Sequence, residues 1–164
     1  MRAIGLNFQK GRFRVAVLNR DNSGTVSFHD ARAITVDPDL PVPELMERYA
    51  TQLRIQFDDF HPDVVAARQV WDAGNVEGAM CQIAPFGIAA YVCNERSIPF
   101  RHYTPQAIRH PAPLGLMKGV NPIAVVDQTF GTHPPYWDEM QRRAVLARIM
   151  QRFELRAACG AVFG

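Results

Sequence analysis

The chain has 164 residues, of which 48% are hydrophobic and 21% charged. This composition excludes a wholly disordered protein, and the length predicts one domain over residues 1–164 that buries roughly 68–70% of its unfolded surface. The formal net charge of +2 neither demands nor excludes a polyanionic partner. Because the chain lacks a long unbroken apolar run, we expect no membrane-spanning helix and no membrane partner.

The three cysteines, Cys81, Cys93 and Cys159, form no CxxC pair. An odd and sparse set of this kind is typical of a reducing compartment, so we expect a cytoplasmic protein. Cys81 and Cys93 fall within one predicted helix, about 120° apart around its axis, which favours core thiols over metal ligands.

The first third of the chain predicts three β-strands. Residues 3–8 and 12–19 are β-rich and are joined by a short glycine-containing connection at 9–11. A turn signal at 21–24 leads to a third strand within 25–36. Short turns between consecutive strands predict an antiparallel meander.

A helix is expected after the proline-containing segment 37–43, because apolar residues recur at three- and four-residue spacing. The recurring apolar residues of this predicted helix are Met46, Tyr49, Ala50, Leu53 and Phe57. A buried strand then begins at Val64. A second helix is predicted from about residue 75 to 94, bent by its internal Pro85. Its expected inner side consists of Val76, Met80, Ile83, Gly87, Ile88 and Tyr91.

A final strand is expected at 98–103, followed by a helical turn over 104–109 that Thr104 caps. Residues 110–135 are rich in proline and glycine and predict a long irregular connection, anchored to the core through 123–126. The last helix is predicted from Trp137 to about residue 155. The order β-β-β-α-β-α-β-α predicts an α/β fold: a mixed five-stranded sheet, with three meander strands and two crossover strands, covered by helices on both faces.

Four segments resemble the ribonuclease H fold and, within it, the RuvC Holliday-junction resolvases. The opening hairpin at 1–18 is similar to the first hairpin of such nucleases, and 62–75 looks like the resolvase strand that carries a catalytic Glu and opens a helix. Residues 85–92 are similar to the family's small-residue helix, and 98–105 to its next strand and helix start. An uncharacterised group of small bacterial RuvC-related domains resembles the layout still more closely.

The resemblance implies a nuclease that holds two Mg²⁺ ions with clustered carboxylates. At the first of these positions the chain has Asn7, and at the position of the Glu it has Arg68. On the last helix Asp138 is a possible residual acid, but the turn at 141–144 reads Gln-Arg-Arg-Ala. We therefore expect a degenerate site without catalytic residues, bound metal or cofactor.

Two hypotheses follow. In the first, a catalytically inactive domain binds nucleic acid through basic side chains. These are Arg68, Lys118, Arg142, Arg143, Arg148 and Arg152. The competing interpretation, which the acids on the last helix favour, pairs Arg68 internally with Asp138 and leaves the helix arginines solvated.

In the second hypothesis the chain is a non-catalytic protein-interaction domain or a self-associating scaffold, bound to a protein partner or to a second copy. Its basis is the small net charge, the apolar helices and the long proline-rich loop, which we expect to cover a partner surface. A third is a divergent metal-dependent nuclease, with Asp72, Asp127 and Asp138 regrouped around one metal ion.

Overall fold

The structure, a computed structural model, describes residues 1–69, 76–109, 116–134 and 137–147. Expectations for Asp72, Arg148, Arg152, Cys159 and the end of the last helix lie outside these residues. No helix in the described part of the chain is both long and apolar enough to span a bilayer.

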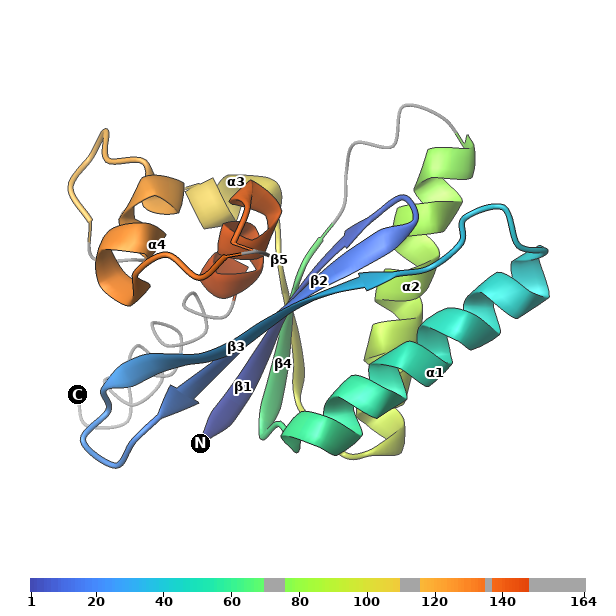
Figure 1. Cartoon of the computed structure of the whole chain (residues 1–164), viewed down its shortest axis with the longest axis horizontal. Helices are drawn as coiled ribbons and strands as arrows, with labels where there is room; N and C mark the ends of the chain where they lie inside the picture. Colours follow the sequence, from blue (N-terminus) through green and yellow to red (C-terminus); the bar gives the residue numbers. More distant parts are fainter. Residues whose placement is uncertain (70–75, 110–115, 135–136, 148–164) are drawn as a thin grey trace, which may run out of the picture.

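The centre of the fold is a five-stranded sheet with the order β3-β2-β1-β4-β5 (Figure 1). The first three strands are antiparallel, and β4 and β5 run parallel to β1. Their bounds are β1 Arg2–Gln9, β2 Arg12–Arg20, β3 Val26–Thr35, β4 Val64–Arg68 and β5 Phe100–Tyr103. The mixed sheet predicted from the sequence is therefore confirmed.

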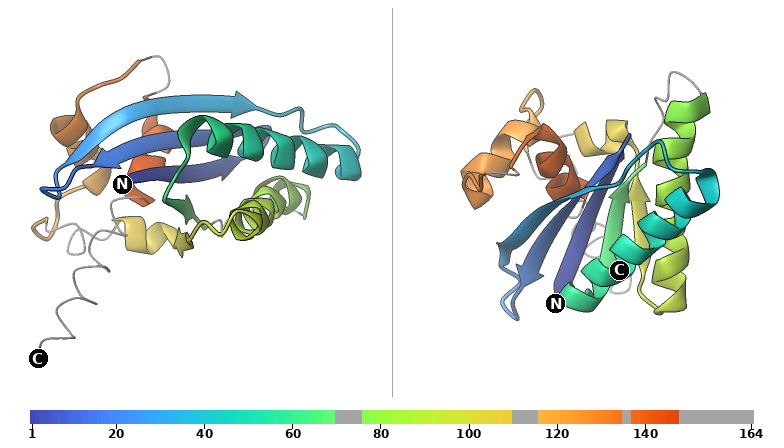
Figure 2. Two further views of the ribbon diagram at one scale, coloured as in Figure 1. Left: turned by 90° about the horizontal axis from the view of Figure 1, so that it is seen from below. Right: turned by 45° about the vertical axis from the view of Figure 1, so that its right-hand side comes forward.

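One face of the sheet packs against α1 (Val42–Phe60) and α2 (Val76–Glu95) (Figures 1 and 2). Alternate strand residues fill this core: Ile4, Leu6, Phe8, Phe13, Val15, Val17, Val65 and Ala67. From α1 they meet Tyr49, Leu53 and Phe57, as its apolar spacing predicts. The period of two along the strands thus sends one set of side chains to this core and the other set to the opposite face.

The inner side predicted for α2 is largely wrong. Met80, Ile83, Gly87 and Tyr91 are exposed, and Ile88 is half-buried against the core. Over residues 80–95, where the burial of α2 is described, the buried residues are Cys81, Pro85, Ala89, Val92 and Cys93, and the predicted Val76 lies outside this range. The helix is apolar around most of its circumference, so spacing alone does not say which side meets the sheet. Cys81 and Cys93 are core thiols as expected, and burial raises the pKa of Cys93 to about 12.

The other face is covered by α3 (Pro105–Arg109), α4 (Pro122–Phe130) and the helical residues 139–147. The connection expected to be irregular thus contains α4. The sequence carried its signals: Asn121 accepts a hydrogen bond from the Ile123 N–H at 3.0 Å, proline follows at the first helical position, and Gly131 ends the helix at a φ of 78°. Val126 is buried, so the expected anchor at 123–126 is confirmed.

The last helix lies directly on β1. A Cβ atom built on Gly5 would come within 1.9 Å of the Ala144 carbonyl oxygen, so only glycine permits this approach. The approach sets the first turn of the helix over the end of β1, where Asn7 lies. Trp137 is buried just before the helix, which begins at residue 139.

Candidate functional site

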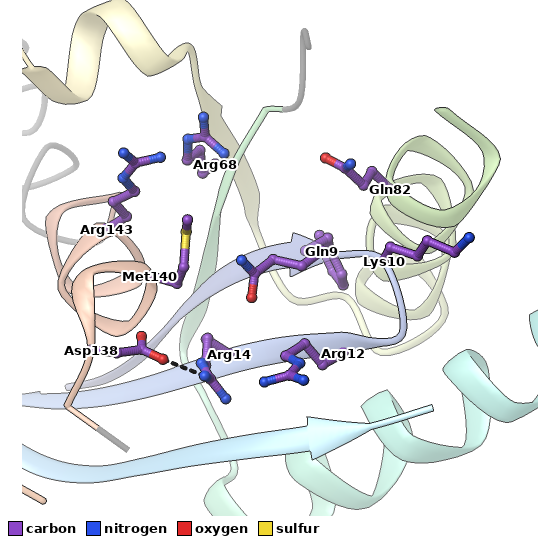
Figure 3. A pocket seen from close by; sticks show the side chains of 10 residues that line it. Gln9, Lys10, Arg12, Arg14, Arg68, Gln82, Asp138, Met140 and Arg143 are labelled. Carbon is purple, nitrogen blue, oxygen red and sulfur yellow. Dashed lines mark hydrogen bonds and ion pairs between the residues drawn. The ribbon is translucent and has the colours of Figure 1, made fainter. Parts of the chain in front are cut away.

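A cleft of roughly 580 Å³ opens at the ends of β1 and β4, between the β1–β2 hairpin, α2 and the last helix (Figure 3). Five of its lining side chains are cationic and one is a carboxylate. The lining consists of Phe8, Gln9, Lys10, Arg12, Arg14, Arg68, Gln82, Asp138, Met140 and Arg143.

The pairing of β1 with β2 directs the hairpin's basic side chains into this cleft. Asn7 lies opposite Arg14 and Gln9 opposite Arg12, and residues that are directly opposite share one face of an antiparallel pair. Phe13, between the two arginines, points to the core on the other face. The alternation Arg-Phe-Arg therefore separates a cationic surface from a hydrophobic one within three residues.

Asn7 and Arg68 lie together at the inner end of the cleft. The Arg68 guanidinium donates a long hydrogen bond of 3.5 Å to the Asn7 side-chain oxygen. Asn7 is completely buried, and its amide nitrogen donates to the Met140 carbonyl oxygen at 3.2 Å. The amide of Asn7 thus joins β4 to the first turn of the last helix.

Asp138 pairs with Arg14, whereas the sequence led us to expect an internal pair with Arg68. The second oxygen of Asp138 accepts from the Gln141 backbone N–H at 2.8 Å, so this carboxylate also caps the helix. The Arg14 side chain is only 10% exposed, and its Nε lies buried without an acceptor. Arg14 lies on β2, and the start of the helix also contacts this strand, because the Gln141 side-chain amide donates to the Val15 carbonyl oxygen (Figure 3 shows the Arg14–Asp138 contact).

The other predicted basic residues divide into two groups. Arg143 lines the cleft and pairs with Glu139 one turn earlier. Arg142 instead donates to Asp127 at 2.7 Å, and this hydrogen bond holds the pKa of the Asp127 carboxyl below its usual value. Lys118 is exposed but does not line the cleft.

A family model described as crossover junction endodeoxyribonuclease RuvC matches residues 9–118. The chain belongs to the RuvC family. The RuvC of Corynebacterium glutamicum is 25% identical over 109 residues, which are 66% of this chain and 49% of that protein. The RuvC of Chloroflexus aggregans is 27% identical over 109 residues, 66% of each chain. The match thus spans about half the length of the Corynebacterium relative.

Solved RuvC structures share the fold. Thermus thermophilus RuvC superimposes with a TM-score of 0.78 at 16% identity, covering 96% of this chain and 97% of its own. The same protein in complex with a Holliday junction substrate gives a TM-score of 0.75 at 16% identity, covering 96% of both chains. The yeast mitochondrial Holliday junction resolvase Ydc2 gives 0.68 at 12% identity, covering 98% of this chain and 84% of its own.

The described residues that line the cleft present more cations than acids to a divalent ion. Among the residues that the structure describes, no three His, Cys, Asp or Glu side chains come together as a metal-binding group. The Asn7 oxygen faces a guanidinium, and the Asp138 carboxylate is already paired with one. Two unit positive charges 4 Å apart repel each other by about 4 kcal/mol at an effective dielectric constant of 20. Asp127 pairs with Arg142 and Asp138 with Arg14, so each of these two carboxylates already faces a cation.

Sequence reasoning missed three cationic residues of the cleft: Lys10, Arg12 and Arg14. All three lie in the segment that the RuvC family model matches. A usable signal was present, since a hairpin with Arg-Phe-Arg in its second strand must send both arginines to the face away from Phe13. The sequence alone did not show that Asn7 lies on the same face as these arginines, because this depends on the register of β1 against β2.

Proposed function

We propose that this RuvC-family domain binds nucleic acid through the phosphate backbone and holds it in the cationic cleft without cutting it. The observation that carries the proposal is the lining of the cleft, in which five cations stand against one carboxylate. This imbalance is local, since the whole chain has a formal net charge of only +2. Concentrated positive charge in a concave surface attracts a polyanion more strongly than the same charge spread over the molecule.

The chemistry of the lining suits phosphates. Arginine presents a planar set of N–H donors that matches two phosphate oxygens, and four of the five cations are arginines. Lys10 and Arg12 are exposed at the hairpin and accessible to an entering strand. Gln9 and Gln82 add amide groups that can bond to sugar or base edges. The solved Thermus RuvC in complex with a Holliday junction substrate adds support from the same fold.

The absence of cleavage is the second part of the proposal. Two-metal hydrolysis needs carboxylates that are available to the ions. Here Asp138 is engaged by Arg14, and Asn7 contributes a neutral oxygen that Arg68 already contacts. Positive charge supplied by fixed arginines can bind a phosphodiester, but it provides no metal-activated water to attack it.

The test is fluorescence anisotropy with a labelled four-way junction and a duplex, at NaCl concentrations from 50 to 300 mM. If about four phosphates are neutralised, affinity should fall roughly 150-fold between 50 and 200 mM salt. Arg12→Gln should weaken binding and reduce the salt slope by about 0.9. Arg20→Gln is the matched control, because it removes the same charge about 26 Å away at the other end of β2.

Equal losses in the two variants, or binding that ignores salt, would contradict a role for the cleft. The cleavage part is tested by incubating the same substrates with Mg²⁺ or Mn²⁺. A metal-dependent product would show that the domain is a divergent nuclease.

Both hydrophobic core clusters of the described residues contain side chains of the one sheet, which supports a single domain over 1–164.

A second candidate function is self-association. Met80, Ile83 and Tyr91 form an apolar stripe on α2 with exposed fractions of 44%, 54% and 58%. Apolar side chains gathered on one helix face favour a protein partner or a second copy of the chain. Sedimentation analysis from micromolar to millimolar concentration should then show a dimer that Ile83→Glu disrupts and Ile55→Glu, on the exposed side of α1, does not. A strict monomer would exclude self-association.

A further inference from the structure

Arg14 is short of hydrogen-bond acceptors for a buried arginine. Its side chain is nine-tenths buried in the wall of the cleft, and the buried Nε–H has no acceptor. A guanidinium carries five N–H donors, and burial without acceptors is costly. The buried guanidinium therefore depends on the one carboxylate that pairs with it, Asp138.

The carboxylate that Arg14 does hold lies in the cleft itself. Asp138 is the single acidic residue of the lining, and its side chain is 43% exposed (Figure 3). One oxygen pairs with Arg14 and the other caps the last helix through the Gln141 N–H at 2.8 Å. An ion pair with one solvent-exposed partner breaks more readily than an ion pair with two buried partners, because water can solvate the exposed group after it leaves.

We infer that Asp138 occupies an anion subsite at Arg14, and that a phosphodiester group of bound nucleic acid displaces it from that subsite. This inference rests on the proposed function of the cleft. A carboxylate and a phosphate offer an arginine the same pair of oxygen acceptors, so one can replace the other. Asp138 keeps its helix cap through the oxygen that does not touch Arg14.

The consequence is an intramolecular competitor within the binding site. In the free protein Asp138 reduces the cost of the buried Arg14 charge, and during binding it opposes the incoming phosphate. The bound phosphate must replace Asp138 at Arg14, which lowers the affinity of the wild-type chain. Removing the charge of Asp138 while preserving its shape should therefore strengthen binding, and the gain should depend on Arg14.

The experiment compares four proteins in the anisotropy assay: wild type, Asp138→Asn, Arg14→Gln and the double variant. Asparagine is as good a helix cap as aspartate, so Asp138→Asn removes charge and retains the fold. It should bind duplex DNA about tenfold more tightly than wild type, the order expected for one charge-assisted hydrogen bond. Its salt slope should stay close to that of the wild type, because a phosphate contacts Arg14 in both bound states.

In the Arg14→Gln background the same change at Asp138 should give little gain. Glu47→Gln, an equal charge change on the exposed side of α1, should leave affinity unaltered. No gain in DNA affinity in Asp138→Asn, or a gain that persists in the Arg14→Gln background, would overturn the subsite. The proposed function would still stand if the wild-type chain bound DNA. Failure of all four proteins to bind DNA would overturn both.

A second measurement covers the case in which Asp138→Asn loses stability. Inorganic phosphate should raise the melting temperature of this variant more than that of the wild type, because the anion replaces the missing carboxylate beside Arg14. Equal shifts in the two proteins would count against the subsite.

Discussion

Arg14 on β2 and Asp138 at the start of the last helix form an ion pair across 124 residues of sequence. The pair joins the meander to the C-terminal helix and closes one side of the cationic cleft. It also determines what Asp138 can do, because a carboxylate that neutralises a buried guanidinium is a poor ligand for a second cation. The properties of the cleft therefore depend on this contact as much as on the number of its arginines.

The two functions of Asp138 can be separated by substitution. Asp138→Asn should lose the charge contact but keep the cap, whereas Asp138→Ala should lose both. We expect the free energy of unfolding to decrease in the order wild type, Asn, Ala, with about 1 kcal/mol between the last two for the lost cap. Urea denaturation measures this order. Equal stability of the two variants would show that the 2.8 Å contact to the Gln141 N–H contributes nothing.

Gly5 should be intolerant of a side chain. Gly5→Ala places a methyl group against the Ala144 carbonyl, so the last helix must shift, at a cost of about 1–3 kcal/mol. Gly87→Ala is the control, because nothing lies within 4 Å of the added atom and α2 gains helix propensity. That variant should be more stable by roughly 0.5–1 kcal/mol. Denaturant unfolding of both proteins tests the contrast, and a neutral Gly5→Ala would refute the close approach.

Carboxylates placed at the two altered positions should create a metal site. Asn7→Asp combined with Arg68→Glu would bring two acids toward Asp138 and remove the cation that now lies against residue 7. Mn²⁺ at about 100 times its dissociation constant should then stabilise the folded variant by about 2.7 kcal/mol. Thermal unfolding with and without Mn²⁺ measures this effect.

Arg68→Gln controls for the loss of the cation alone and should not respond to Mn²⁺. A comparable stabilisation of the wild-type chain would instead indicate that its present acids already hold a metal, as in the divergent-nuclease hypothesis.

The Asp127–Arg142 pair should make stability depend on acid pH. Arg142 lowers the pKa of Asp127 from its ordinary value of 3.8, so the folded state favours the charged carboxylate. The contribution is present above about pH 4 and is lost as the pH falls through the lowered pKa. Asp127→Asn should therefore flatten the fall in the free energy of unfolding below pH 4.

Trp137 provides a local readout of this change, because its indole N–H donates to Asp127. In a Trp71→Phe background Trp137 is the only tryptophan, and its emission should shift as Asp127 is protonated. Asp58→Asn is the control, since Arg96 lowers the pKa of Asp58 on the far face of the sheet. The Asp58→Asn variant should keep the pH-dependent shift in Trp137 emission. Loss of that shift in Asp58→Asn would show that the Trp137 signal does not report on Asp127.

The sequence by itself determined the strands and the helical turn at 104–109. These features follow from short-range patterns: alternation along β-strands, turn residues between them, and the cap and proline at the start of the helical turn. The resemblance to RuvC identified positions 7 and 68 as places where the family carries metal-binding acids, which composition alone could not show. Even α4 had its signals in Asn121, Pro122 and Gly131, although the density of prolines around it favoured an irregular connection.

Only the tertiary structure decided which side of α2 is buried, which arginines enter the cleft, and which of them holds Asp138. An almost uniformly apolar helix has no periodic signal to orient it, so the sheet it meets selects Cys81 and Val92 and leaves Ile83 outside. The pairing of Arg14 with Asp138 depends on a helix that rests on Gly5, a contact between segments far apart in the chain. Local periodicity carries no information about such contacts, because they arise from the packing of whole elements.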